Sequence, residues 1–501
     1  MSIFATKSIE QITTEQLGDS EGGGLKRVLG PGQLMLLGVG AIIGTGIFVL
    51  TGQAAAANAG PAIVISMVVA GLTSVLAALC YSEFAASVPV AGSAYTYAYA
   101  TLGEFVAWVI GWDLILEYAL GAATVAVGWS GNFITLLGQL GLSFPAALSA
   151  APGTLVAVAG GNPVTAVFNL PAVIVTAAVT LLLIVGVSES ASVNAVIVVI
   201  KVAVVLVVIA AGSLFMDSAN WHPLIPPNTG TFGEYGWSGI LRGAGVIFFA
   251  YIGFDAVSTS AQEARNPQRD MPRGILGSLA ICTVLYVLVS GVMVGLVHYR
   301  DMLNEPAPLV IAIQAAANRA AGTPWQGTMS VVKILVTVGA LAGLSSVMVV
   351  MMLAQPRIFL SMSKDGLLPE WAGRVHPRFR TPHISTMVTG AVVALASGLT
   401  PIGTLGTLVS IGTLMAFVIV SLGIVVLRRT RPDLPRPFRM PWVPLLPILS
   451  ALVSLILMLG LPRATWERLI IWMVIGIAFY FLYGFRKSRL RGAEPRAYAV
   501  R

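Results

Sequence analysis

Charged residues are scarce in this sequence. They make up 10% of the 501 residues, while hydrophobic residues make up 56% and the mean hydropathy is +0.87. A soluble globular chain carries about 25% charged residues, because its surface must face water. The composition therefore predicts an integral membrane protein and excludes a soluble globular domain.

Histidine and cysteine are also scarce. The four histidines fall in or beside predicted loops: His222, His298, His376 and His383. The two cysteines, Cys80 and Cys282, lie inside apolar runs, which leaves no CxxC site and no disulfide framework. The segment "GVGAIIG" misses the GxGxxG spacing by one residue, and no GxxxxGK[ST] phosphate loop is present. We therefore expect no metal, no cofactor and no enzymatic activity.

Long apolar runs dominate the sequence instead. A membrane-spanning helix needs roughly 20 apolar residues. The predicted spans are 32–54, 61–86, 103–137, 168–187, 191–215, 238–260, 274–298, 328–356, 383–400, 403–427, 443–461 and 467–485. Residues 1–29 and 486–501 are left as polar ends. The fold class expected is an all-α membrane protein of twelve transmembrane helices.

The basic residues indicate how these spans are oriented. Most of the 29 Lys and Arg residues fall in the two polar ends and in the even-numbered connections. The odd-numbered connections hold Arg300, Arg319, Arg463 and Arg468. Positive charge collects on the cytoplasmic side of membrane proteins, so we expect both termini in the cytoplasm of a multi-pass cell-membrane protein. Basic residues scattered over such loops contact membrane lipid rather than nucleic acid.

The first predicted span contains an unusual run of glycines, "GVGAIIGTGIFVLTG", from Gly38 to Gly52. Gly40 and Gly44 have the GxxxG spacing of a helix-packing face. The alternative is a helix broken inside the membrane, because glycine tolerates non-helical backbone and lets a ligand approach closely.

A second segment favours the broken helix. "GAGVIFFAYIGFD", Gly243 to Asp255, lies in the sixth predicted span, and aligning Gly38 with Gly243 also aligns Ile42 with Ile247. Five spans per repeat is an odd number, so the second repeat is inverted relative to the membrane, as in many secondary transporters.

Four motifs resemble a known family. They are "GAIIGTGIFVLTG", "SEFAASVPVAGSAYTYAYATLGE", "FFAYIGFDAVSTSAQEARNPQRDMPRGI" and "QPRIFLSMSKDGLLPEWAGRVHPRFRTP", from Gly40 to about Pro382. In this order they resemble an amino acid permease of the APC superfamily, in the branch similar to the cationic amino acid transporters. Where that family usually has paired acids before "NP", this chain has Gln262-Glu263.

The resemblance implies a LeuT-like fold of five plus five inverted spans. The first repeat would cover 30–216 and the second 237–427, followed by two further helices in 442–485. The first and sixth helices would be broken, and the chain would carry twelve spans, as in bacterial relatives, rather than fourteen.

The resemblance also implies a substrate site. In span one, the backbone at Ile42, Ile43, Gly44, Thr45 and Gly46 would bind the carboxylate end of an amino acid, which a helix N-terminus favours. In span six, carbonyls of Phe249, Ala250 and Ile252 would accept hydrogen bonds from the ammonium. In span eight, Leu344 with Ser345 or Ser346 would lie near the substrate side chain.

Lys201 is the most unusual residue of the fifth span. It lies about ten residues, or roughly 15 Å, from either end, too deep for its stem to bring the ammonium to water. An ionisable residue at this depth is functional by default. In the resembled family a lysine here supports proton coupling, so we expect Lys201 to titrate during transport.

Two acidic residues each have two candidate roles. Glu117 is deep in span three, where it would either tie helices together or, as the resemblance favours, form a gate with the Thr45 region. Asp255 would either bond freed backbone or contact substrate. Glu83 and Asp113 lie nearer the predicted cytoplasmic ends and are assigned no function.

The sequence thus predicts a secondary active transporter that couples protons to uptake of small neutral L-amino acids such as alanine. Three alternatives stay open. One is a transporter of arginine or lysine, another is an obligate exchanger, and a channel or membrane enzyme fits least. The oligomeric state is undetermined, and a monomer is compatible with the sequence.

Overall fold

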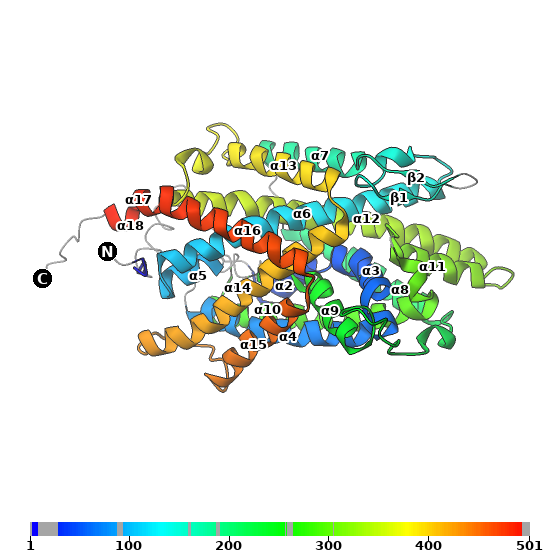
Figure 1. The fold of residues 1–501 in the computed structure, drawn as a ribbon, viewed down its shortest axis with the longest axis horizontal. Coiled ribbons are helices and arrows are strands. Elements are labelled where there is room, and N and C mark those ends of the chain that lie inside the picture. The colour runs from blue at the N-terminus through cyan, green and yellow to red at the C-terminus, as the bar shows by residue number, and fades with distance from the viewer. Residues whose placement is uncertain are drawn as a thin grey trace, which may run out of the picture.

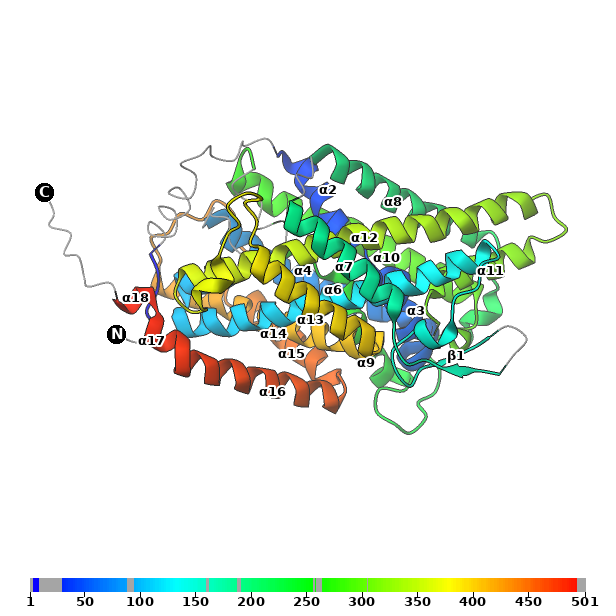
Figure 2. The same cartoon turned by 90° about the horizontal axis from the view of Figure 1, so that it is seen from above.

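The structure is a computed structural model that describes residues 3–8, 29–87, 94–158, 162–186, 191–255, 257, 264–303 and 305–492. It is built almost entirely of helices, most of them running along the long axis of the molecule (Figures 1 and 2). The described parts of the N- and C-terminal regions lie toward the same end. A fold of this kind agrees with the composition, because apolar helices satisfy their own backbone hydrogen bonds.

The helices differ widely in length. In chain order the α-helices are α2 (Pro31–Ile42), α3 (Thr51–Ala54), α4 (Ile63–Ser87), α5 (Ala94–Thr101), α6 (Glu104–Gln139), α7 (Leu170–Val185), α8 (Ala191–Ser213), α9 (Gly236–Ile247), α10 (Pro267–Leu296), α11 (Pro308–Arg319), α12 (Gln326–Lys364), α13 (His383–Leu399), α14 (Ile402–Thr430), α15 (Leu445–Gly460), α16 (Arg463–Phe479), α17 (Phe485–Lys487) and α18 (Arg489–Gly492).

Short helical turns and one small hairpin join these helices. The 3₁₀ and π turns are η1 (Gly46–Leu50), η2 (Ala55–Ala59), η3 (Gly60–Ala62), η4 (Ala146–Leu148), η5 (Ser218–Trp221), η6 (Phe248–Tyr251), η8 (Tyr299–Met302), η9 (Glu370–Gly373) and η10 (Tyr480–Gly484). The two strands, β1 (Leu155–Val156) and β2 (Val164–Thr165), are antiparallel, with Leu155 opposite Thr165.

Seven helical runs among the described residues are long and apolar enough to cross a membrane. Four shorter apolar helices, α2, α7, α13 and α15, accompany them. The first long run, Gly46–Ser87, is not one straight span, because Gly60 has φ +61° and the chain turns back there toward α5. A left-handed backbone of this kind suits glycine. The count of twelve spans stays a prediction.

The helices differ from the predicted spans at two helix ends and in two additional short helices. The seventh predicted span begins earlier, because α10 starts at Pro267, a residue suited to the first turn of a helix. The eighth extends to Lys364, since α12 continues through Pro356. The short helices α5 and α11 were not predicted, because neither contains an apolar run long enough to span.

The long helices pack in pairs that are distant in sequence. α4 packs against α10, α6 against α12, and α7 against α13. The outer pairs correspond as well: α2 contacts α8 and α10, and α9 contacts α14 and α4. The contacts of α2 therefore have counterparts in the contacts of α9.

Buried ion pairs fix the end of the molecule where the termini lie. Glu83 of α4, fully buried, pairs with Arg428 at 2.6 Å and Arg436 at 3.6 Å and accepts from the Met440 N–H at 2.7 Å. Lys7 pairs with Asp365 at 2.6 Å. These contacts give Glu83 a structural role, because a buried charge persists only when it is paired.

Candidate functional site

The first transmembrane segment is interrupted inside its glycine-rich run. α2 ends at Ile42, Ile43 is extended (φ −71°, ψ 102°), and the helix resumes at Gly46. The interruption frees backbone carbonyls, and side chains bind two of the nearby carbonyl groups. The Tyr286 hydroxyl donates to the Ile42 oxygen at 2.8 Å, and the Thr51 hydroxyl donates to the Gly46 oxygen at 2.8 Å. The Tyr286 hydroxyl thus replaces a helical hydrogen bond that lipid cannot supply, whereas the Gly46 oxygen also accepts from the Thr51 N–H.

The predicted sixth span is interrupted at the corresponding place. α9 ends at Ile247, a 3₁₀ turn covers Phe248–Tyr251, and Ile252 is extended (φ −66°, ψ 141°). Gly253 follows with φ +113°, a conformation that only glycine adopts readily. The rest of predicted span six, and Gln262-Glu263, fall mostly outside the described residues.

The two interruptions touch each other. A Cβ built on Gly46 would overlap the Ala250 Cα, and one built on Gly253 would lie 2.8 Å from the Ala41 carbonyl oxygen. Each glycine therefore removes the side chain that would keep the two backbones apart. The structure brings together the span-one and span-six residues that the sequence assigns to the substrate site.

The helix that restarts after the first interruption offers donors to an anion. The Ile47 and Phe48 N–H groups bond the Gly44 oxygen at 3.2 and 3.3 Å, so they are not the donors. The donors are the N–H groups that come before them, because the first N–H groups of any helix lack an acceptor in a preceding turn. The Thr45 hydroxyl is fully buried and has no hydrogen-bond partner among the described residues. Such a group fits a site that binds a carboxylate.

Helix α12 contributes an apolar wall to this site, but not through all the residues predicted. Val347 faces Gly44, where an added Cβ would lie 3.2 Å from the Val347 Cγ2, and Leu344 is fully buried. Ser345 is half-buried and occupied elsewhere: it accepts from Trp129 Nε1 at 3.0 Å and donates to the Leu341 oxygen at 2.8 Å. Val347 is therefore the α12 residue that packs on Gly44, and the predicted place of Ser345 or Ser346 near the substrate side chain stays a prediction. Helical spacing from Gly343, which faces Lys201, could have indicated Val347 one turn later.

Lys201 is enclosed by the helices around the first interruption. It is 0% exposed, and its Nζ donates to the Gly40 oxygen at 2.7 Å. A Cβ on Gly343 of α12 would lie 3.3 Å from the lysine Cγ and 3.5 Å from a ring carbon of Phe48. The lysine therefore holds the last turn of α2, one turn before the chain unwinds, and its ammonium does not reach the membrane surface.

Glu117 does not contact Thr45 in this structure, and the predicted gate between Glu117 and the Thr45 region stays a prediction. The α6 residue that packs on Thr45 is Gly128, where a Cβ would lie 2.8 Å from Thr45 Cγ2. Glu117 precedes Gly128 by three helical turns, roughly 16 Å. Its Oε1 has no hydrogen-bond partner among the described residues.

Glu117 lies instead in a buried acidic neighbourhood. Asp255, Asp113 and Thr413 are its close polar neighbours, and the Tyr118 hydroxyl donates to Asp255 at 3.3 Å. Asp113, which the sequence left without a role, is fully buried, and neither carboxylate oxygen has a hydrogen-bond partner among the described residues. Burying carboxylates together is costly, and this acidic neighbourhood extends to the second interruption, because Asp255 lies two residues after Gly253.

Comparison with known proteins agrees with this geometry. Residues 29–480 match the family model described as "Amino acid permease". The chain is 45% identical to the branched-chain amino acid permease BcaP of Bacillus subtilis, over 98% of this chain and 99% of the relative. It is 42% identical to the methylthioribose transporter of the same organism, with the same coverage. It is 38% identical to the vacuolar cationic amino acid transporter 4 of Arabidopsis thaliana, over 82% of this chain and 64% of the relative. A polytopic helical chain with these matches belongs to the amino acid permease family.

Proposed function

We propose that this protein is a proton-coupled symporter of neutral aliphatic L-amino acids that works by alternating access. The observation that carries the proposal is the contact of the two interrupted helices at Gly46 and Ala250. Interrupted helices that meet inside a bundle expose backbone donors and acceptors to a substrate, and they are the usual binding site of inverted-repeat transporters.

The helix arrangement supports an inverted repeat of five plus five spans, with two more helices after it. α2 and α9 are both 12 residues long, and they begin and end at the same offset that relates Gly38 to Gly243. The pairing of α4 with α10, α6 with α12 and α7 with α13 fits a two-fold relation between the halves. The repeated halves can then rock against each other around a fixed site.

The site's lining favours an apolar substrate side chain. Leu344, Val347, Phe249 and Ile252 are buried around the interruptions. A guanidinium or ammonium side chain would require a carboxylate there. Glu117 lies about three turns before Gly128 on α6, and Asp255, two residues after Gly253, is the carboxylate whose role competition by arginine tests. One relative is named for branched-chain amino acids, but others at similar identity are named for methylthioribose and for cationic amino acids. The lining, rather than the names, therefore carries the substrate proposal.

Lys201 supports the coupling to protons. Its ammonium bonds the Gly40 carbonyl, so loss of a proton would remove a charge directly beneath the first interruption. The position of α2 would then depend on whether Lys201 is protonated. In this proposal α2 has two positions, and binding of a proton to Lys201 shifts the balance between them. The basic residues at the ends of the spans support an orientation with both termini in the cytoplasm.

Uptake into proteoliposomes tests the proposal. Purified protein would be given radiolabelled alanine or leucine with an inward proton gradient, no sodium, and unlabelled arginine as competitor. We expect concentrative uptake that collapses with the gradient and resists arginine. Uptake only into vesicles preloaded with amino acid would indicate an exchanger, and strong competition by arginine would indicate a cationic substrate.

A further inference from the structure

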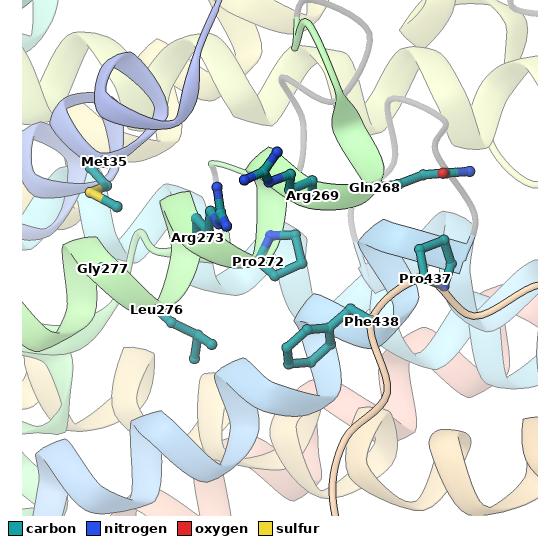
Figure 3. A pocket seen from close by; sticks show the side chains of 9 residues that line it. All are labelled: Met35, Gln268, Arg269, Pro272, Arg273, Leu276, Gly277, Pro437 and Phe438. Atoms are coloured by element: carbon teal, nitrogen blue, oxygen red, sulfur yellow. The ribbon is translucent and has the colours of Figure 1, made fainter.

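A cavity away from the helix interruptions opens between α2, the start of α10 and the chain after α14. Its volume is about 690 Å³, and the described residues that line it are Met35, Gln268, Arg269, Pro272, Arg273, Leu276, Gly277, Pro437 and Phe438. Figure 3 shows the two arginine side chains close together on one side of the cavity, with Leu276 and Phe438 on the other. A space of this size matches that of ordinary ligand sites.

The described residues that line the cavity carry positive charge and no negative charge. Arg269 and Arg273 are four residues apart on α10, so their side chains share one face. Both are exposed, and neither side chain forms an ion pair or hydrogen bond in the part of the chain that the structure describes. No carboxylate is among the described lining residues, since the nearby Asp270 is buried and accepts from the Asn266 N–H at 3.2 Å. Two adjacent cations without a partner favour a bound anion.

The other side of the cavity is apolar, and this restricts which anions can fill the cavity. The apolar stretch of α10 begins at Gly274, so both arginines lie just beyond the hydrocarbon edge while Leu276 and Gly277 lie within it. Met35 packs on Gly277, where an added Cβ would lie 2.7 Å from the Met35 Cε. An occupant must therefore carry its negative charge at headgroup level and an apolar part below it.

The far wall of the cavity is rigidly built. Pro437 and Phe438 lie between Arg436 and Met440, and both of these residues are held by the buried Glu83 carboxylate. A wall fixed by a buried ion pair keeps its shape without a ligand, which reduces the cost of ordering on binding.

We infer that this cavity binds the headgroup of an anionic phospholipid, with Arg269 and Arg273 on the phosphate and with an acyl chain along Met35, Leu276 and Phe438. A free phosphate ion would leave the apolar wall unused. The bound lipid would brace α2 against α10, because these helices already pack closely, with the Cβ position of Gly274 2.7 Å from Leu34 Cβ.

The test is lipid binding by the purified full-length chain, independent of transport. Thermal unfolding in a neutral detergent would be followed while short-chain phosphatidylglycerol, short-chain phosphatidylcholine or inorganic phosphate is added. We expect only phosphatidylglycerol to raise the unfolding temperature. Each basic residue near a lipid surface contributes roughly a factor of five in affinity, so Arg269→Gln/Arg273→Gln should weaken the response about 30-fold.

The matched control is Arg486→Gln/Lys487→Gln, which removes two exposed basic residues at the end of another span, with no lining residue of this cavity. The control should respond like the unmodified protein, and both variants should unfold at similar temperatures without lipid. An undiminished response in Arg269→Gln/Arg273→Gln, an equal loss in the control, or an equal response to inorganic phosphate would each overturn the inference. If the double variant unfolds early, native mass spectrometry of Arg273→Gln alone, counting bound phosphatidylglycerol, decides the question.

Discussion

At the scale of single residues, two side chains combine full burial with an unusual chemical state. Lys201 places an ammonium inside the helix bundle with a backbone carbonyl as acceptor, and Thr45 places a hydroxyl there with no partner among the described residues. Both arrangements cost folding free energy, and groups kept at such a cost are candidates for a role in function. Each side chain therefore supports a prediction in which a substitution impairs transport for a reason other than loss of folding stability.

Lys201→Met keeps the length of the side chain and removes its charge. We expect uptake driven by a proton gradient to fall at least tenfold, while exchange of labelled for unlabelled amino acid at equal pH persists, because the substrate site itself is intact. Lys201→Arg should restore less than half of the driven uptake. Lys333→Met is the control, since Lys333 bonds the Gln314 side chain at 2.7 Å outside the site. Full gradient-driven uptake by Lys201→Met would refute the coupling role.

Thr45→Val removes the unpartnered hydroxyl without changing the shape of the side chain. A hydrogen bond to a charged group is worth about 1.5–3 kcal/mol, so the apparent KM for amino acid should rise about tenfold or more. The unfolding temperature should stay the same or rise, because a buried unsatisfied hydroxyl is lost. Thr51→Val, which loses a bond to the Gly46 oxygen, should lower the unfolding temperature instead. A KM unchanged in Thr45→Val would remove this hydroxyl from the site.

At the scale of elements, the interruptions of α2 and α9 depend on glycines that let backbones meet. Gly46 lies against the Ala250 backbone, whereas Gly44 lies against the end of a valine side chain. Backbone cannot move aside as a side chain can, so the two glycines differ in their tolerance of a methyl group.

Gly46→Ala should therefore destabilise the protein and abolish transport, by the 1–3 kcal/mol or more that overpacking costs. Gly44→Ala should be milder, because Val347 can shift by a few tenths of an ångström. Gly327→Ala, in α12 with nothing within 4 Å of the new Cβ, should be neutral or stabilising. Thermal unfolding and uptake measured on all three variants test the order, and equal effects at Gly44 and Gly46 would contradict the crossing of the two backbones.

At the scale of the whole molecule, the orientation follows from charge rather than from packing. Cys80 and Cys282 are buried, so a single introduced cysteine can report which side a loop faces. Asp433→Cys, in the exposed connection before α15, should react with an impermeant maleimide only from the cytoplasmic side of oriented vesicles. Ser143→Cys, in the exposed connection after α6, should react only from the other side. The reverse labelling would overturn the orientation with cytoplasmic termini.

The sequence by itself determined that this is a helical membrane protein with glycine-rich interruptions in its first and sixth apolar runs. Apolar length and glycine content are local properties, so they can be read without knowing the fold. The depth of Lys201 in its span was equally local. The resemblance in the motifs added the family and the paired segments of the substrate site.

Only the tertiary structure decided which side chains meet. It placed Val347 rather than Ser345 beside Gly44, moved Glu117 away from Thr45, gave Glu83 two arginine partners, and left Asp113 buried without a hydrogen-bond partner among the described residues. These outcomes depend on how far each helix is rotated about its axis and shifted along it. A shift of one residue turns a helix face by about 100°, and a single sequence does not fix that angle to within one residue.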